Sequence, residues 1–102
     1  MVIVERVYEL TRLFPKEELY GLTSQMRRAG VSVPSNIAEG FGRRHNTEYR
    51  QFLFIALGSC AELVTQLVIA QRLGYLAAET CDSLTDEVEQ ISKMTMGLIK
   101  KL

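Results

Sequence analysis

The sequence predicts an all-α protein, an antiparallel up-down four-helix bundle, from three observations. Apolar residues recur at helical spacings of three and four almost throughout the 102 residues. β-Branched residues nowhere alternate with polar ones over a useful length, so strand signals are absent. Hydrophobic residues make up 47% of the chain and there are only two prolines, as is typical of a chain that folds around a core. At this length we expect residues 1–102 to form a single domain.

The first helix is expected over about residues 2–13, where Ile3, Val7, Leu10 and Phe14 follow one another at spacings of four, three and four. Pro15 ends this helix, because the residue before a proline is pushed out of the α region. The proline and the acidic residues just after it then suit the first turn of a short helical segment.

The second helix is expected to begin near Leu22 and to carry a stripe of apolar and small residues as far as Gly40. Pro34 falls inside this stripe, where it removes a backbone hydrogen bond and crowds the preceding turn. Two interpretations compete: one kinked continuous helix, or a break near Ser32 with Pro34 opening a new helix. The stripe keeps its phase across the proline, which favours the kink. Glycines at 40 and 42 suit the left-handed conformation that ends many helices.

The third helix should run from a cap at Asn46 or Thr47 to Gly74, and it is apolar nearly all round. Between residues 52 and 70, 14 of the 19 residues are apolar or cysteine. The segment is long enough to span a bilayer, but Glu62 within it disfavours a membrane span. A helix that is apolar on every side is buried on every side, and no helix of so small a bundle is wholly interior. The surplus apolar face therefore predicts a homo-oligomer.

The fourth helix is expected over about residues 77–101. Apolar residues from Leu84 to Leu102 follow the alternating spacing of four and three that is typical of a bundle seam. Acidic residues fill its first half and lysines its second half, an order that suits the helix dipole. We expect this charged side to be a solvated face without a function of its own.

Composition excludes several classes of function. Lys+Arg and Asp+Glu both number 12, so the net charge is zero and a uniformly basic nucleic-acid coat is excluded. With two cysteines 21 residues apart and one histidine, no zinc finger or Cys/His cluster can be built. Cys60 and Cys81 are expected to be reduced core residues of a cytoplasmic protein, and no targeting segment is evident.

Arginines concentrate between residues 25 and 50, where five of them stand against two glutamates and give a local charge of +3. All are arginine and none is lysine, which suits bidentate contacts with phosphates. No RNA-recognition signature occurs, so we do not expect specific reading of bases. In a ring of subunits the cluster would recur in every copy as a positive rim. The predicted nucleic-acid-binding residues are Arg27, Arg43, Arg44, His45 and Arg50.

Polar residues on the second and third helices are the other candidate for a site. Paired carboxylates in a bundle suggest a di-iron centre, but that centre needs Glu-x-x-His on two helices, so no metal is predicted. Acid–base catalysis needs a cleft and a raised pKa, for which the sequence gives no sign. We instead expect a structural polar network that fixes helix register, since polar groups buried without partners are costly. Its members are Arg28, Asn36, Glu39, Ser59 and Glu62.

Several motifs of the second and third helices are distinctive. The run Ser32-Val33-Pro34-Ser35-Asn36-Ile37-Ala38-Glu39-Gly40 is followed by Gly58-Ser59, Glu62-Leu63 and Leu73-Gly74-Tyr75. Over roughly residues 7–102 the chain resembles the four-helix-bundle family first noted as open reading frames inside 23S rRNA intervening sequences. A relative of that family is the accessory variability determinant protein of diversity-generating retroelements. The resemblance implies an up-down bundle that assembles as a ring, usually a pentamer, and a link to RNA or retroelement loci.

Two hypotheses of function follow. The first is a non-enzymatic, ring-forming bundle that binds structured RNA, or an RNA–protein complex, through the phosphates. The alternative is a protein-interaction scaffold, such as an accessory subunit for a retroelement reverse transcriptase, with nucleic-acid binding secondary. A hydrolytic or metal-dependent enzyme is the weakest interpretation, and no cofactor or small-molecule substrate is expected.

Overall fold

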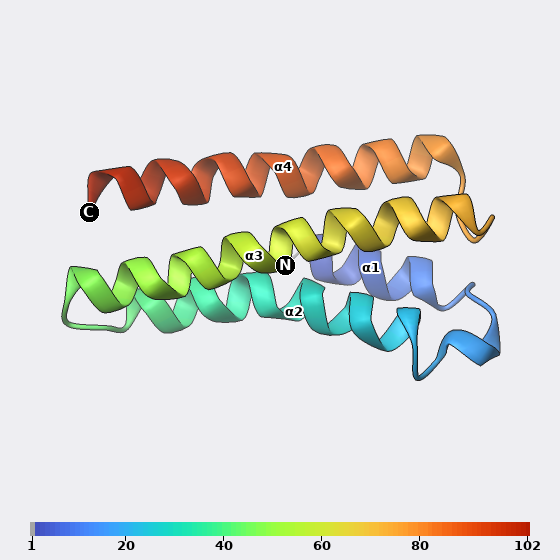
Figure 1. Cartoon of the computed structure of the whole chain (residues 1–102), viewed down its shortest axis with the longest axis horizontal. Coiled ribbons are helices and arrows are strands. Elements are labelled where there is room, and N and C mark those ends of the chain that lie inside the picture. Colours follow the sequence, from blue (N-terminus) through green and yellow to red (C-terminus); the bar gives the residue numbers. More distant parts are fainter. Residues whose placement is uncertain (1) are drawn as a thin grey trace.

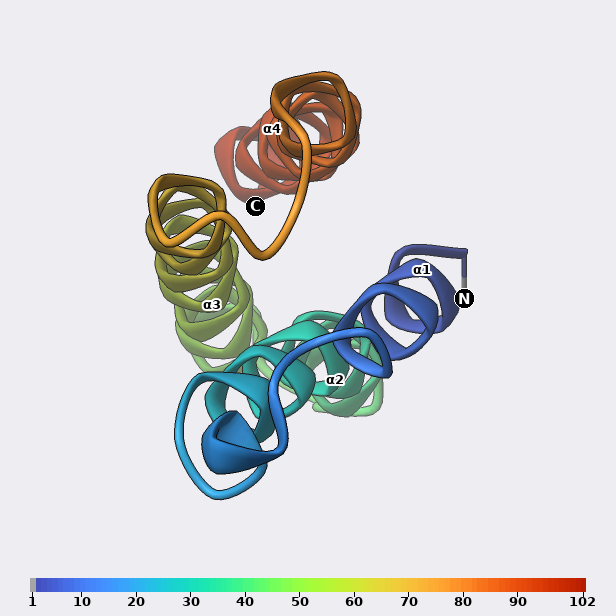
Figure 2. The same ribbon diagram turned by 90° about the vertical axis from the view of Figure 1, so that its right-hand side faces the viewer.

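The computed structural model describes residues 2–102, and in them it forms four α-helices, one 3-10 turn and no strand. In chain order these are α1 (Val2–Thr11), η1 (Lys16–Glu18), α2 (Leu22–Phe41), α3 (Asn46–Arg72) and α4 (Ala78–Lys101). Successive α-helices run in opposite directions along the long axis (Figure 1). Seen from the end, they occupy four corners, with α3 between α2 and α4 (Figure 2). The prediction of an all-α protein is confirmed.

α1 is two residues shorter than the sequence predicts. Its last turn tightens, because the N–H groups of Leu13 and Phe14 bond to carbonyls three residues back, at 3.1 Å each. The Thr11 hydroxyl also donates to the Val7 carbonyl at 2.7 Å. α1 therefore covers only one half of the bundle, and Figure 1 shows α2, α3 and α4 continuing past its first residue to the other end of the molecule.

α2 is one continuous helix of 20 residues that contains Pro34, so the chain does not break near Ser32. The glycines at its end do not have the expected role. Gly42 has a φ of −79°, in the right-handed region, and among residues 2–102 the positive φ belongs to Gly74. Gly40 instead allows α3 to approach, since a Cβ added there would lie 2.9 Å from the Phe52 Cβ.

The core is formed by one stripe of each helix, with Val7, Met26, Leu63, Leu67, Leu84 and Val88 among its fully buried side chains. Cys60 and Cys81 are both free and buried in this core, as predicted for structural cysteines. Burial raises the pKa of the Cys60 thiol above its usual value, although a hydrogen bond with Ser92 opposes the rise. A protonated, enclosed thiol of this kind is not a nucleophile.

α3 ends in a Schellman motif that fixes the connection to α4. Gly74, with a φ of +80°, donates to the Gln71 carbonyl and Tyr75 donates to the Ala70 carbonyl, both at 2.9 Å. The turn directs the Tyr75 ring onto Phe14, at 5.3 Å between ring centroids. The Tyr75 hydroxyl donates to Glu18 of η1 at 2.9 Å, so the two connections at this end of the bundle hold each other.

The outer face of α3 remains uncovered in the single chain. Large apolar side chains on it are between 38% and 54% exposed, namely Phe54, Ile55, Val68, Ile69 and Leu73. By length and composition alone α3 could cross a membrane, but core helices of soluble proteins meet the same criterion. Of its most apolar 18-residue window, 33% is buried inside the protein. The surplus apolar surface inferred from the sequence is therefore present in the structure.

Candidate nucleic-acid interface and the cleft between α2 and α3

The connection between α2 and α3 places three of the predicted phosphate-binding residues together at one end of the molecule. Arg43, Arg44 and His45 are all exposed, and they line a hollow of about 340 Å³ together with Gly42 and Glu48. His45 is the N-cap of α3, and its side chain does not bond to the N–H groups of the first turn. Free N–H groups at a helix N-terminus favour anions, so arginine side chains and a helix end converge on the same hollow.

Arg43 is already held in place by the protein. Its Nη2 donates to Glu39 Oε1 at 2.8 Å, and its guanidinium lies 4.8 Å from the centre of the Phe52 ring. The glutamate offsets part of the Arg43 charge. Arg44 and Arg50 form no ion pair among residues 2–102, so their charges are available to a ligand.

The structure does not bring Arg27 to this end. Sixteen positions separate it from Arg43, about 24 Å at the helical rise of 1.5 Å per residue. Arg27 Nε donates to the Thr11 hydroxyl at 2.9 Å, and its guanidinium lies 4.7 Å over the Tyr8 ring. Arg27 therefore belongs to the contact between α1 and α2, and the predicted set divides into four residues at one end and one elsewhere.

Sequence reasoning missed the contribution of α4 to the basic end. The end of α4 lies at the same end of the bundle as the α2–α3 connection (Figure 1). The half formed by residues 32–59 and 90–102 has two acidic residues, Glu39 and Glu48, and six basic ones, a net charge of +4 in a neutral protein. The antiparallel order of the helices would have placed the lysines there. The six basic residues are Arg43, Arg44, Arg50, Lys93, Lys100 and Lys101.

The predicted polar network forms only in part. The hydroxyls of Ser32 and Ser59 share a hydrogen bond of 2.8 Å that links α2 to α3. Asn36 Nδ2 donates to the Ser32 hydroxyl at 2.9 Å and to the Ser32 carbonyl at 2.8 Å. Glu39 turns away to Arg43, so it is not part of this group.

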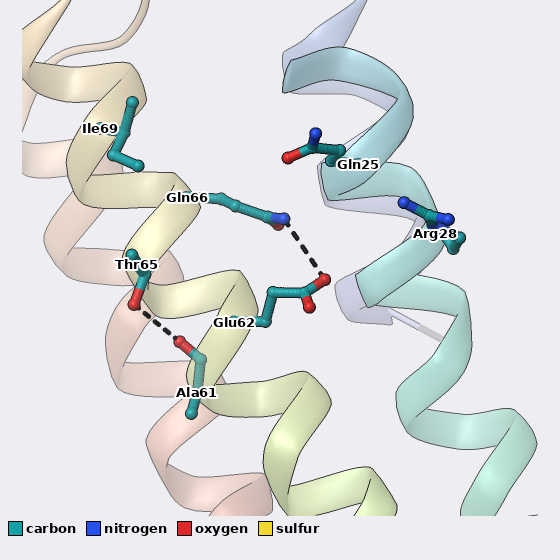
Figure 3. A pocket seen from close by; sticks show the side chains of 7 residues that line it. All are labelled: Gln25, Arg28, Ala61, Glu62, Thr65, Gln66 and Ile69. Atoms are coloured by element: carbon teal, nitrogen blue, oxygen red, sulfur yellow. Dashed lines mark hydrogen bonds between the residues drawn. The ribbon is translucent and has the colours of Figure 1, made fainter. Parts of the chain in front are cut away.

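Arg28 and Glu62 lie apart from these residues, on opposite walls of a cleft of about 520 Å³ between α2 and α3 (Figure 3). Gln25 and Arg28 line the α2 side, and Glu62 and Gln66 line the α3 side. Gln66 Nε2 donates to Glu62 Oε1 at 3.4 Å, whereas Gln66 Oε1 is buried and has no hydrogen-bond partner among residues 2–102. Arg28 and Glu62 form no ion pair there. Between Arg28 and Glu62, therefore, the structure has an open polar cleft where the sequence predicts a hydrogen-bonded network.

Comparison with known proteins places the chain in a family. A family model for the 23S rRNA-intervening sequence protein matches residues 1–97. Among curated proteins, none matches the chain. A crystal structure from Bacteroides thetaiotaomicron, of a protein with unknown function from the S23 ribosomal protein family, superposes with a TM-score of 0.85. It is 23% identical, and the match covers 97% of this chain and 90% of that one, which shows the shared fold.

Proposed function

We propose a function from one premise: the chain belongs to the 23S rRNA-intervening sequence protein family. The protein is a non-enzymatic, homo-oligomeric up-down bundle, and it binds RNA by its phosphates at the basic end. The residues that contact phosphate are Arg43, Arg44, His45 and Arg50. The observation that carries the proposal is the hollow between Arg43, Arg44 and His45 at the uncapped start of α3.

The distribution of charge supports binding at that end. A neutral chain gives no general attraction for a polyanion, but the half with the α2–α3 connection has a net charge of +4. Arginine forms bidentate hydrogen bonds with phosphate, and a helix N-terminus adds N–H donors. Contacts of this kind position a protein on RNA without reading its sequence, so affinity should be strongly salt dependent.

The exposed face of α3 supports the homo-oligomer. Phe54, Gly58, Ala61, Thr65 and Ile69 follow one another at spacings of four, three, four and four, so they form a single apolar or small stripe along the helix. Within the described part of the chain, no atom lies within 4 Å of a Cβ built at Gly58, so a partner helix can approach closely there. A second copy that covers this stripe removes it from water. In a cyclic assembly every basic end then faces the same side, and five copies is the number that the resemblance implies.

The test is charge reversal at the hollow. Arg43→Glu combined with Arg44→Glu should weaken binding to a structured RNA about tenfold or more. The plot of the logarithm of the binding constant against the logarithm of the salt concentration should become less steep by about 1.5, since two phosphate contacts are lost. The matched control, Arg12→Glu with Lys16→Glu, makes the same change in net charge with two exposed residues far from the hollow. Its affinity should stay near that of the wild type.

Fluorescence anisotropy at several salt concentrations measures the affinity, and ultracentrifugation checks that the mass of the assembly is unchanged. Equal RNA binding by the Arg43/Arg44 variant and the wild type would refute the phosphate site. The protein-interaction scaffold predicts that equality, because nucleic-acid binding is then secondary to a contact with a partner enzyme.

A further inference from the structure

The cleft between α2 and α3 has an acceptor that the chain itself does not satisfy. Gln66 is only 5% exposed, yet its Oε1 has no donor among residues 2–102. That oxygen has almost no accessible surface and is closed to a donor from outside the chain, so an outside donor meets this wall at Glu62. Glu62 is one helical turn away on the same wall, and its carboxylate has lone pairs to spare.

The chemistry of this wall favours a guanidinium group. The two oxygens of the exposed Glu62 carboxylate are adjacent acceptors, which match the parallel N–H groups of an arginine side chain. A lysine ammonium offers a point charge without this planar fork. The stripe of α3 proposed to meet a second copy includes Ala61, Thr65 and Ile69, which also line the cleft. The arginine is therefore to be sought on a neighbouring copy.

Arg27 is the arginine that the structure holds ready for such a contact. Its Nε is bonded to Thr11 and its guanidinium lies over Tyr8, so the group is fixed, while neither Nη has a hydrogen-bond partner in the described chain. A group that is already ordered loses little conformational entropy on binding. Arg27 lines a second hollow, of about 510 Å³, on the other side of α2. Exposed Leu19 and Tyr20, 48% and 93% accessible, flank it.

The two hollows lie at the same level along the bundle. Arg28 lines both of them, with the cleft toward α3 on one side and the second hollow toward α1 on the other. Rotation about an axis parallel to the bundle can therefore bring the α3 face of one copy onto the α1–α2 face of the next without a shift along the axis. Because the two faces differ, the contact is heterologous, and a heterologous contact repeated by rotation forms a closed ring when the rotation angle divides a full turn.

We propose that the Nη groups of Arg27 of one copy donate to the Glu62 carboxylate at the α2–α3 cleft of the next copy. Around this contact, Tyr8, Leu19 and Tyr20 cover the exposed apolar residues of α3. The inference rests on the homo-oligomer proposed above and adds to it the two faces that meet and the side chains that lock them.

Charge reversal on each side of the contact tests the inference. Glu62→Arg and Arg27→Glu each place like charges at every contact, so each variant alone should dissociate, with a dissociation constant raised about tenfold or more. Both substitutions combined in one chain restore opposite charges at every contact, whatever the number of copies, and this double variant should assemble again. Ultracentrifugation and native mass measurement give the masses, and circular dichroism checks that each variant is folded.

A second variant keeps the test independent of Arg27, whose replacement also removes the bond to Thr11. Glu62→Gln removes the negative charge and leaves Arg27 in place, so it should weaken the assembly while the separate chain stays folded. An unchanged mass for Glu62→Arg when the wild type is oligomeric, or no recovery of assembly in the double variant, would overturn the contact alone. A wild-type protein that sediments as a single subunit would overturn the homo-oligomer and the contact together.

Discussion

The close approach of α2 and α3 at Gly40 determines whether replacing this glycine by alanine stabilises or destabilises the fold. A Cβ added at Gly40 would lie 2.9 Å from the Phe52 Cβ, 2.9 Å from the Tyr49 Cδ1 and 3.2 Å from the Tyr49 carbonyl oxygen. Overpacking of this kind costs about 1–3 kcal/mol, whereas alanine in place of glycine in a helix contributes about 1 kcal/mol. Gly40→Ala should therefore lower the free energy of unfolding by up to about 2 kcal/mol.

The matched control is Gly97→Ala. Gly97 lies inside α4, and no atom of residues 2–102 is within 4 Å of the Cβ that alanine would add. Only the helix preference acts there, so this variant should gain about 0.5–1 kcal/mol. The two substitutions are chemically identical, and the difference between them isolates the contact between α2 and α3.

Urea unfolding followed by circular dichroism measures both variants, at one protein concentration because association shifts apparent stability. For a chain of this size, about 1 kcal/mol moves the unfolding temperature by about 4–8 °C, so the two midpoints should move in opposite directions. A gain in stability for Gly40→Ala equal to that for Gly97→Ala would refute the argument, since α2 and α3 would then separate at Gly40 without cost.

Two further predictions concern hydrogen bonds between elements. Ser59→Ala removes the hydrogen bond to Ser32, so it should lower the free energy of unfolding in urea by about 0.5–1.5 kcal/mol. The control, Ser35→Ala at an exposed position of α2, should change stability little. Equal effects of the two substitutions would exclude a role for the serine pair. The hydrogen bond to Glu18 raises the pKa of Tyr75, with smaller contributions from burial and from the charges of Glu18 and Glu17. A pKa raised in the folded state gives stabilisation that is present below the unfolded value of about 10 and is lost as pH rises through the folded value. Tyr75→Phe should therefore be less stable than the wild type at pH 8, and the two unfolding free energies should converge above pH 10, whereas a constant difference up to pH 11 would contradict this account.

Periodicity was sufficient to predict the elements but not the reasons for their boundaries. The spacing of Ile3, Val7 and Leu10 predicts α1, because a helical stripe shows directly in the sequence. The sequence predicts that Gly40 helps to end α2, since glycine commonly has that role. Its role in the structure depends on the side chains of α3 that lie against it. Nothing in the sequence indicates that these side chains lie close to Gly40. A tertiary approach of this kind becomes visible only when two helices are placed together.

The candidate site was predicted where its residues are neighbours in the chain. Arg43, Arg44 and His45 are consecutive, so their gathering needed no knowledge of the fold. Arg27 was grouped with them by its place in an arginine-rich stretch, although the rise of α2 carries it to the other half of the molecule. Counting charge along the sequence ignores direction, and the lysines of α4 were missed for the same reason.

The two proposals are linked by electrostatics. In a ring with parallel bundle axes, each copy adds a net charge of +4 to the half of the assembly that faces one side. These like charges repel, so the apolar face of α3 and the arginine contact must offset that repulsion. A polyanion bound along the basic ends would remove part of this repulsion, so the two proposals together predict that RNA binds the assembly more tightly than it binds separate copies. By linkage the reverse also holds: RNA must strengthen the assembly by the same factor by which assembly strengthens RNA binding.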